Sequence, residues 1–528
     1  MPSRTAVAAI LFVGLVFLPP VGRAEGSTCR GFPVTISGTA GPDDLRGTPG
    51  DDVIAGLEGD DLIRGLGGHD VFCGDGGDDR IIPGRGRDIV DGGVGTDVLS
   101  YHDSRFPVLV DLHRGNAIGN GVDRVIAVER VVGSEYGDVL IGGAEADRLD
   151  GGSGDDRLLG GDGGDYLSGG PGDDEVLGGP GFDLVDGAGG SDLCDGESTS
   201  SCASGLPRPA VFVSTGGDDH GDGNTPQTAV RTLQRAVHLI GGGGTVFVLP
   251  GRYREGLSLD GELPDTPIRI AGVGGRPILD GEETRTLGIF CHGCRGLIVE
   301  WLRVVGFTDI GVGATLSTGV GLRHLRVVGN GHRVQLTGWE LEGYGIHVDE
   351  SIGVVIEDSQ LSDNGPTPPR PGLLLGTAIN TFGNRDVIIR RNRAHHNHGA
   401  GILVEDSVGV LVEANEVFEN DLDASIEGWW DGGIWIDGGA AVVIRANVVR
   451  DNQGVGIELS DEERQSPTGY VLENNVSTGN YWGIFVWNFR TTAWPDSSIV
   501  LLGTGNTFDG NLCGDVWIAP RSDYAPCP

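Results

Sequence analysis

Residues 151–194 read GGSGDDRLLGGDGGDYLSGGPGDDEVLGGPGFDLVDGAGGSDLC, and the same nine-residue unit recurs through the first third of the chain. The unit has the form G-G-x-G-x-D-x-U-x, in which U is apolar. An apolar residue follows each repeat Asp by two positions, from Leu45 in the first unit to Cys194 in the last. This strict register predicts very short strands with one inward side chain per unit. The repeat Asp form two series: Asp43, Asp52, Asp61, Asp70, Asp79, Asp88 and Asp97, then Asp138, Asp147, Asp156, Asp165, Asp174, Asp183 and Asp192.

The residue types of this unit indicate calcium binding. Glycine enters loop conformations with positive φ at little cost, and Gly-rich loops expose backbone carbonyls. Ca²⁺ takes six to eight oxygen ligands from carboxylates and carbonyls. We therefore predict that all of the repeat Asp are ligands of multiple Ca²⁺ ions. An acidic low-complexity linker is the alternative, but a linker has no reason to keep an apolar residue in register with Asp.

Residues 38–100 and 133–195 resemble the RTX (haemolysin-type) calcium-binding repeats. The resemblance implies a parallel β-roll in which calcium ions lie between successive turns. Residues 101–132 interrupt the repeats, and the alternation of Val108, Val110 and Leu112 predicts a strand there. We interpret this segment as a non-binding spacer or cap.

Charge and the N-terminal segment limit the class of partner. The chain has 528 residues, a formal net charge of −39 and no lysine. A nucleic-acid partner is excluded because the phosphate backbone requires a basic surface. Met1–Ala24 has the features of a signal peptide, with Arg4 before an apolar run at 6–18 that is too short to span a bilayer. We expect a secreted, extracellular protein that does not span a membrane.

An exported protein can form disulfides. Eight cysteines are present, and Cys194/Cys202 and Cys513/Cys527 are close enough in sequence for local pairs. Cys291 and Cys294 have CxxC spacing, but the chain has no second CxxC for a zinc site. A disulfide or two free thiols is expected there.

Composition changes near Ser200, where the Ser/Pro-rich segment 198–209 begins. Residues 228–240 place apolar side chains on one helical face, and an apolar strand follows at 245–249. Further on, Asn recurs in pairs five residues apart, each pair after an apolar strand, which predicts one solenoid coil per 20 to 35 residues with stacked Asn at its turn. The pairs are Asn392/Asn397, Asn415/Asn420, Asn447/Asn452, Asn475/Asn480 and Asn506/Asn511, with Ser359/Asn364 one coil earlier.

The order of helix, strand and Asn-bearing coils resembles right-handed parallel β-helix proteins of the pectate-lyase-like superfamily, in which the helix caps the open end of the solenoid. We therefore predict an all-β chain: an RTX parallel β-roll followed by a right-handed single-stranded parallel β-helix. The predicted segments are a signal peptide at 1–24, a β-roll at 25–197 with blocks 38–100 and 133–195 and spacer 101–132, a linker at 198–209, and a β-helix at 210–528.

Candidate catalytic residues follow from aligning the strands that begin with Gly-Ile or Ala-Ile. Residues one and three positions after each Ile should face outward, because the buried residue lies between them. This places Glu405 beside Asp437, with Glu458 one coil further. Paired carboxylates can act on a glycosidic bond as acid and nucleophile, or can hold a calcium ion. A solvated polar face is the alternative.

Aromatic residues are concentrated on the same predicted face, and exposed indole rings next to carboxylates are typical of sugar binding. The alternative is that these rings only cover the flank of the solenoid. The predicted substrate-binding residues are Trp429, Trp430, Trp435, Trp482, Trp487 and Arg490.

The pectate-lyase-like resemblance implies extracellular polysaccharide as the substrate class, cleaved by a lyase or a hydrolase. Lyases of that superfamily abstract a proton with Lys or Arg; lysine is absent here, and Arg rarely loses its proton. Hydrolysis is therefore favoured slightly. The other hypothesis is a non-catalytic surface, matrix or adhesion protein.

Overall fold

The computed structural model describes residues 28–196, 198–202, 210–241, 243–260, 267–332, 335–337, 340–366, 373–374, 376–420, 432–460, 469–487 and 500–519. The chain divides into two compact units, residues 1–99 with 126–128 and residues 100–125 with 129–528. The predicted signal peptide lies outside the described residues. The predicted boundary at 198–209 between a roll and a β-helix stays a prediction.

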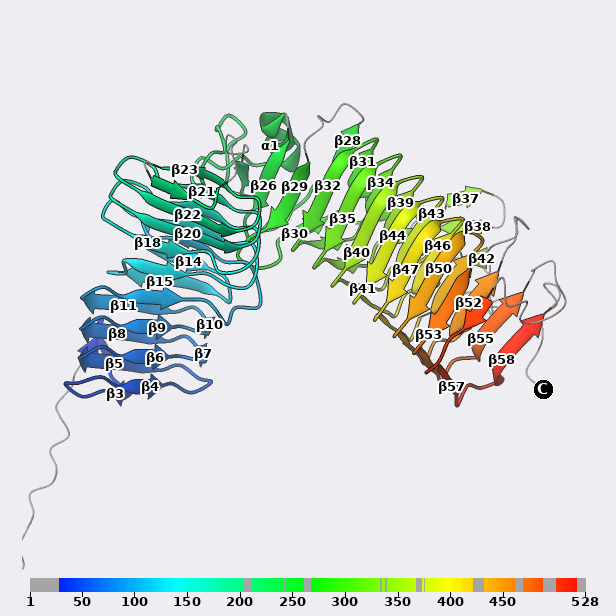
Figure 1. Ribbon diagram of the computed structural model, residues 1–528, viewed down its shortest axis with the longest axis horizontal. Helices are drawn as coiled ribbons and strands as arrows, with labels where there is room; N and C mark the ends of the chain where they lie inside the picture. Colours follow the sequence, from blue (N-terminus) through cyan, green and yellow to red (C-terminus); the bar gives the residue numbers. More distant parts are fainter. Residues whose placement is uncertain are drawn as a thin grey trace, which may run out of the picture. The chain divides into compact units, whose positions relative to one another are not determined.

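The first unit is a parallel β-roll in which successive repeats alternate between two sheets (Figure 1). Strands two repeats apart pair, so that Ile54 lies beside Phe72 and Ile63 beside Ile81. The side chains of all four are at most 1% exposed, which confirms the predicted inward apolar position. One sheet contains β3 (Ile36–Ser37), β5 (Val53–Glu58), β8 (Val71–Gly76) and β11 (Ile89–Val94), and the other contains β4 (Asp44–Arg46), β6 (Leu62–Arg64), β9 (Arg80–Ile82) and β12 (Val98–Ser100). Short pairs are formed by β1 (Thr28–Cys29) with β2 (Phe32–Pro33) and by β7 (Gly67–Gly68) with β10 (Arg85–Gly86).

The second repeat block, in the second unit, has the same two-sheet pattern. Leu140 lies beside Leu158, and Leu149 beside Leu167, all fully buried. The spacer forms the predicted strand as β13 (Leu109–Asp111), which pairs antiparallel with β14 (Asn116–Ile118) and parallel with the first strand of the block. The remaining strands are β15 (Val122–Ile126), β16 (Arg130–Val132), β17 (Val139–Ile141), β18 (Arg148–Asp150), β19 (Arg157–Leu159), β20 (Tyr166–Pro171), β21 (Glu175–Leu177), β22 (Leu184–Gly189), β23 (Leu193–Asp195) and β24 (Ser198–Ser200).

The rest of the second unit is a parallel β-helix capped by α1 (Leu233–Ile240). Thr232 caps the helix N-terminus by accepting a hydrogen bond from the Arg235 N–H, and Leu233, Ala236, Val237 and Ile240 are buried. The helix is shorter than the predicted 228–240, but its buried face is the predicted one. No helix within the described ranges is long and apolar enough to cross a membrane.

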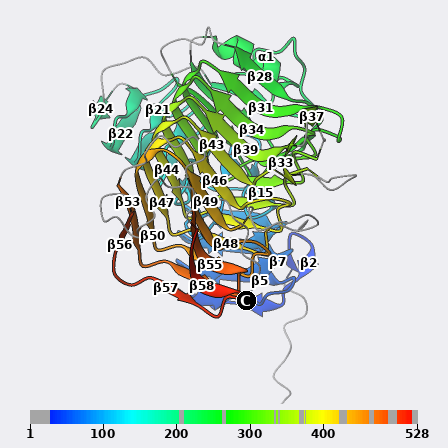
Figure 2. The ribbon, with the colours of Figure 1, turned by 90° about the vertical axis from the view of Figure 1, so that its right-hand side faces the viewer.

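Each coil of the β-helix contributes one strand to each of three sheets (Figures 1 and 2). Sheet I contains β25 (Ala210–Val213), β26 (Gly244–Val248), β29 (Ile268–Gly272), β32 (Arg295–Glu300), β35 (Thr318–Arg323), β40 (Ile352–Glu357), β44 (Arg385–Arg390), β47 (Val408–Glu413), β50 (Ala440–Arg445), β53 (Tyr470–Glu473) and β56 (Val500–Leu502). Sheet II contains β27 (Arg252–Tyr253), β30 (Ile278–Asp280), β33 (Arg303–Val305), β36 (Arg326–Val328), β41 (Gln360–Ser362), β45 (Arg393–His395), β48 (Glu416–Phe418), β51 (Val448–Arg450), β54 (Val476–Thr478) and β57 (Thr507–Asp509). Sheet III contains β28 (Leu257–Asp260), β31 (Leu287–His292), β34 (Ile310–Thr315), β39 (Tyr344–Asp349), β43 (Ile379–Phe382), β46 (Ile402–Glu405), β49 (Ile434–Asp437), β52 (Ile457–Ser460), β55 (Trp482–Trp487) and β58 (Gly514–Ala519). A small additional sheet is formed by β37 (Gln335–Thr337), β38 (Glu340–Glu342) and β42 (Leu373–Leu374).

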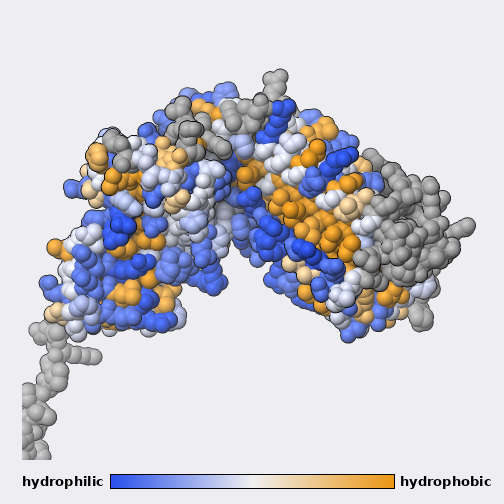
Figure 3. All heavy atoms as spheres, viewed as in Figure 1, coloured by the Kyte–Doolittle hydropathy of each residue, from blue (hydrophilic) through white to orange (hydrophobic). Residues whose placement is uncertain are grey.

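The outward face of sheet I is organised in columns. Figure 3 shows a band of hydrophobic residues over its strands. On the same sheet, the strand register aligns one column of half-buried apolar side chains, those of Val355, Ile388, Leu411 and Val443. Beside this column, Glu and Arg alternate from coil to coil, and Arg445 donates to Glu413 at 2.6 Å.

Buried polar ladders fix the turns of the coils, as the Asn spacing predicts. Asn420 accepts from Asn397, donates to Asn452 at 3.0 Å and donates to the carbonyl of Ala394. The Asn392 series forms a second ladder through Asn415, with the side-chain pair at 3.1 Å. A third ladder was not predicted and runs through Ser317, Ser351, Asn384 and Ser407. Each ladder satisfies amide groups that the turns bury.

Disulfides link cysteines in both units. The predicted Cys194–Cys202 pair is present, and Cys291 and Cys294 form a disulfide rather than two thiols. The bond between Cys29 and Cys73 was not predicted. Cys513 is disulfide-bonded, whereas its predicted partner Cys527 lies outside the described residues.

Candidate functional site

The repeat Asp side chains link one turn of the roll to the next. One carboxylate oxygen, Oδ1, accepts a hydrogen bond from the N–H of the Asp two repeats earlier. The N–H of Asp52 donates to Asp70, and that of Asp156 donates to Asp174, both at 2.8 Å. The carboxylates are therefore held rigidly in the loops that join the two sheets.

The second oxygen of many of these carboxylates, Oδ2, is buried and has no hydrogen-bond partner in the described structure. The carboxylates concerned include those of Asp61, Asp70, Asp79, Asp156, Asp165, Asp174 and Asp192. A buried anionic oxygen without a partner is costly, and a bound cation removes that cost. Desolvation raises the pKa of Asp70 and Asp79 to about 6 and that of Asp174 to about 7.

Backbone carbonyls lie close to these oxygens. A Cβ placed on Gly56 would meet both Oδ2 of Asp61 and the carbonyl oxygen of Gly74, so these two oxygens face the same small space between turns. The described residues contain no group of three or more His, Cys, Asp or Glu that could hold a metal. The donors that face the space between turns are Asp carboxylate oxygens and backbone carbonyl oxygens, a set that fits Ca²⁺.

The repeat Asp are not all equivalent, which the sequence does not reveal. At the start of each block, Oδ2 accepts a hydrogen bond from a loop N–H: from Thr39 to Asp43 at 2.6 Å, and from Thr48 to Asp52 at 2.7 Å. Asp138 and Asp147 accept in the same way from Ser134 and Gly143. The fit to calcium is therefore stronger for the Asp residues that follow the first two of each block.

The candidate active site lies on the outward face of sheet III. In β49, the side chains of Ile434 and Ile436 point into the coil and are buried. Trp435 and Asp437 alternate with them along the strand and therefore lie on its outward face. Glu405 and Asp437 are direct neighbours in the register of β46 and β49. Glu458 pairs with Trp435 in the adjacent column, one strand further on. The alignment of Gly-Ile strands thus predicted the strand register of the three carboxylates correctly, but Glu458 is 1% exposed, so it does not present an open carboxylate to solvent as expected.

The environment of Glu405 favours its protonated form. Desolvation is the main cause, and it raises the pKa of Glu405 to about 7. A hydrogen bond from Asn380 acts in the opposite direction, and the neighbouring charge of Asp437 raises the pKa further. A carboxyl group with such a pKa can serve as a general acid near neutral pH.

Asp437 is oriented by a short chain of hydrogen bonds. The hydroxyl of Ser460 donates to Oδ1 of Asp437 at 2.7 Å, and the indole N–H of Trp435 donates to that hydroxyl at 2.8 Å. Each member comes from the outward face of β49 or β52. This chain fixes one oxygen of the Asp437 carboxylate beside Glu405.

A second ionisable pair lies further along the same face, and it was not among the predicted site residues. His347 Nε2 lies 3.8 Å from Oδ2 of Asp349. Burial acts to raise the pKa of Asp349, but hydrogen bonds from His347 and Thr315 outweigh it and lower that pKa. The strand register connects this pair to Glu405 through Asn380 and Phe382.

Only some of the predicted substrate-binding tryptophans lie in the part of the chain that the structure describes. Trp435 and Trp482 are 6% and 5% exposed, so the expectation that they present open faces to solvent is wrong. The N–H of Trp435 donates to Ser460, and the ring of Trp482 packs on that of Trp517, with the ring centres 5.1 Å apart. Trp429, Trp430, Arg490 and the side chain of Trp487 lie outside the described residues.

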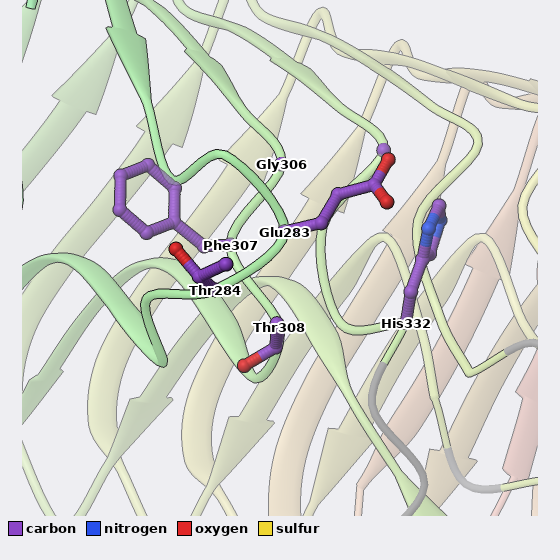
Figure 4. A pocket seen from close by; sticks show the side chains of 7 residues that line it. Glu283, Thr284, Gly306, Phe307, Thr308 and His332 are labelled. Carbon is purple, nitrogen blue, oxygen red and sulfur yellow. The ribbon is translucent and has the colours of Figure 1, made fainter. Parts of the chain in front are cut away.

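A separate pocket of 490 Å³ lies at the turns that lead from sheet II to sheet III in earlier coils (Figure 4). Thr284, Thr308, Phe307, Glu283 and His332 line it, and Glu283 and His332 extend to the same side. The lengths of these turns vary between coils, so no sequence signal identifies this pocket.

Comparisons with protein families identify both halves of the chain. Residues 37–72, 74–99, 132–167 and 168–199 match the RTX calcium-binding nonapeptide repeat. Residues 317–512 match the right-handed β-helix region. The chain therefore carries N-terminal RTX calcium-binding repeats and a C-terminal right-handed β-helix. The comparison with curated protein sequences gives no match.

Several solved structures are similar at low identity. The pectate lyase Pel9A is 15% identical over 58% of this chain and 80% of that chain, with a TM-score of 0.39. The Dettilon tailspike protein gp208 is 14% identical over 84% and 62%, with a TM-score of 0.36. The GH136 lacto-N-biosidase from Eubacterium ramulus is 11% identical over 59% and 68%, with a TM-score of 0.33. Likeness at this level carries no statement about activity.

Proposed function

We propose that this chain is a secreted calcium-binding protein whose β-helix binds and hydrolyses extracellular polysaccharide. Glu405 acts as the general acid on the glycosidic oxygen, and Asp437 acts as the base or nucleophile. The adjacency of these two carboxylates on β46 and β49, with the pKa of Glu405 raised to about 7, carries the proposal. Glu458 lies on the next strand, β52, where it pairs with Trp435 in the adjacent column.

Hydrolysis fits this chain better than elimination. Lyases of the pectate-lyase-like superfamily abstract the proton with Lys or Arg, but the chain contains no lysine, and arginine rarely loses its proton. The disulfides and the calcium-binding repeats support an extracellular location, where oxidising conditions preserve such bonds. We assign the calcium ions to the β-roll, where they stabilise the fold. They have no role in the proposed reaction on sheet III.

The test is product analysis with a panel of neutral and acidic polysaccharides in the presence of Ca²⁺. Hydrolysis releases reducing ends, whereas elimination also produces unsaturated ends that absorb in the ultraviolet. We expect Glu405→Gln and Asp437→Asn each to lower turnover by at least about 100-fold. The matched control is Glu413→Gln, which removes an ion-paired carboxylate from sheet I. Turnover that survives both site variants would refute the assignment.

A further inference from the structure

The outward face of sheet II carries a column of arginines. Ile278 pairs with Arg303, and Arg303 pairs with Arg326, so these two arginines are direct neighbours on β33 and β36. Adjacent strands lie about 4.8 Å apart. Like charges at opposing positions of paired strands destabilise a sheet. A like-charged pair at this point therefore requires an explanation.

Other arginines of the same sheet are neutralised by carboxylates. Arg252 pairs with Asp280, Arg393 lies 3.2 Å from Glu416, and Arg450 lies 2.9 Å from Glu416. Arg303 and Arg326 form no ion pair with any residue in the described part of the chain. The Nε of Arg303 is moreover buried without a hydrogen-bond partner there.

A third arginine, Arg276, extends this cluster from the turn before β30. Its guanidinium lies 5.5 Å from the ring centres of both Phe106 and Trp301, and its Nε is also buried without a described partner. Trp301 in turn stacks on His324 at 4.3 Å. Aromatic rings rather than carboxylates thus hold Arg276 in place.

The backbone brings Arg276 next to this pair, because the N–H of Arg303 donates to the carbonyl of Pro277 at 2.9 Å, and the charge of Arg326 acts on both of the other guanidinium groups. Burial is the main cause that lowers the pKa of Arg276 and of Arg303, and the charge of Arg326 is the second cause for both. This occurs in a chain with a formal net charge of −39, in which carboxylates are abundant. The cluster lacks the counter-charge that the rest of the sheet has.

We propose that Arg276, Arg303 and Arg326 form a binding site for a carboxylate or sulfate group of an acidic glycan. An oxyanion would remove the mutual repulsion and accept paired hydrogen bonds from the planar guanidinium groups. The inference rests on the proposed glycan-binding function, but it places a second glycan contact on sheet II, separate from the carboxylates of sheet III.

The chemistry favours a sparsely charged ligand. Three arginines match one or two anionic groups, whereas nucleic acid presents closely spaced phosphates that the surrounding acidic chain repels. A glycan with one acidic group on some of its sugars keeps the remaining charges apart. The observations therefore favour an acidic glycan over a nucleic acid.

The test is calorimetric titration of the full chain in Ca²⁺ with four probes: a uronate oligosaccharide, a sulfated oligosaccharide, a neutral oligosaccharide of equal length and sodium sulfate. We expect at least one acidic oligosaccharide to bind and the neutral one to bind at least about tenfold more weakly. Arg303→Gln and Arg326→Gln should each weaken acidic binding by about tenfold or more. Arg303→Lys should give an intermediate loss, because it keeps the charge but not the planar fork.

Arg393→Gln is the matched control, since this arginine lies on the same column of sheet II but is paired with Glu416. It should leave acidic binding unchanged. Thermal unfolding checks that the variants fold: the Tm should not fall for Arg303→Gln, which removes repulsion, and should fall slightly for Arg393→Gln, which removes an ion pair.

Several outcomes would overturn the inference. These are equal binding of neutral and acidic probes, no loss in the Arg303 and Arg326 variants, binding of sulfate without either glycan (an adventitious ion only), or tighter binding of duplex nucleic acid. Glu405→Gln distinguishes the two proposals, because it should abolish cleavage and leave binding at the arginine site on sheet II unchanged. If acidic glycan binds through the arginines but no variant or wild-type protein cleaves it, the inference stands while the proposed hydrolysis fails.

Discussion

Glu405 lies directly beside Asp437 in the register of β46 and β49, on the outward face of sheet III. Burial, opposed by Asn380 and aided by the charge of Asp437, raises the pKa of Glu405 to about 7. A carboxyl group that keeps its proton near neutral pH is costly to ionise inside the folded chain. This pair therefore has consequences for stability as well as for chemistry.

The first prediction concerns Glu405 and pH. The unfolded chain releases this proton near pH 4.3, whereas the folded chain holds it up to about pH 7. The folded state therefore binds more protons across that interval, and the free energy of unfolding falls as the pH rises through it. Glu405→Gln removes this fall and should be more stable than the wild type at pH 8 by on the order of 2 kcal/mol.

Denaturant unfolding of both proteins at pH 5 and pH 8 measures this effect. Glu413→Gln, in which an ion-paired carboxylate is removed, should show no gain at pH 8. An identical pH dependence for wild type and Glu405→Gln would contradict the assigned pKa.

The second prediction concerns calcium and the repeats. The carboxylates of Asp61, Asp70, Asp79, Asp156, Asp165 and Asp174 are buried, and one oxygen of each lacks a described partner, so we expect the repeats to depend on cations. Chelation should reduce the β signal in circular dichroism, and calcium at about 100 times its Kd should add about 2.7 kcal/mol to the free energy of unfolding.

Two aspartates of one repeat give a matched comparison. Asp165 is 1% exposed and its Oδ2 is buried without a described partner, whereas Asp162 is exposed. Asp165→Asn should therefore lower the calcium-dependent gain, and Asp162→Asn should not. A full chain that is equally folded and equally stable with and without chelator would overturn the calcium role.

The third prediction concerns the Asn ladder. Asn420 is fully buried and bonds to Asn397, Asn452 and a backbone carbonyl. Asn420→Ala removes these side-chain hydrogen bonds, including the acceptor for the buried backbone N–H of Asn397, and should cost roughly 3 kcal/mol of stability. Gln453→Ala, an exposed change next to Asn452, should alter stability by less than about 0.5 kcal/mol in the same denaturant titration. Equal costs for the two variants would refute the structural role of the ladder.

The fourth prediction compares two disulfides. Cys29–Cys73 closes a chain segment of 44 residues, and Cys194–Cys202 closes one of 8. On the chain-entropy account, the longer loop gives about 1.5 kcal/mol more stabilisation. Calorimetry of the Cys29→Ser/Cys73→Ser and Cys194→Ser/Cys202→Ser proteins measures the difference. A larger loss for the Cys194/Cys202 variant would contradict the loop argument.

Features with a regular period were predictable from the sequence. The nine-residue repeat fixed which side chains are buried, and the Gly-Ile strand starts fixed the neighbours of Glu405. Two ladders were predictable because Asn recurs at one spacing. The ladder through Ser317, Ser351 and Asn384 was missed because its residue types are mixed and the intervening turns differ in length.

Features that depend on tertiary contact were not predictable. Cys29 reaches Cys73 only because the roll brings two distant segments together. Trp435 looked exposed by strand alternation, yet its N–H bonds to Ser460 and its ring is buried. The Arg276 cluster combines a turn with two sheet II strands, and no spacing along the chain marks that combination.

The Asn ladders also bear on how a protein of this kind can change its length. Each Asn side chain, such as Asn397 or Asn420, donates its amide N–H to the amide oxygen of the Asn in the following coil. Wherever the ladder ends, its last Asn therefore has the same unfilled donor. A whole coil can therefore be duplicated or deleted without redesigning its neighbours. The length of such a solenoid can therefore evolve by the gain or loss of whole coils. An insertion or deletion of one residue within a strand, by contrast, would shift the residues that follow it out of register with the ladders.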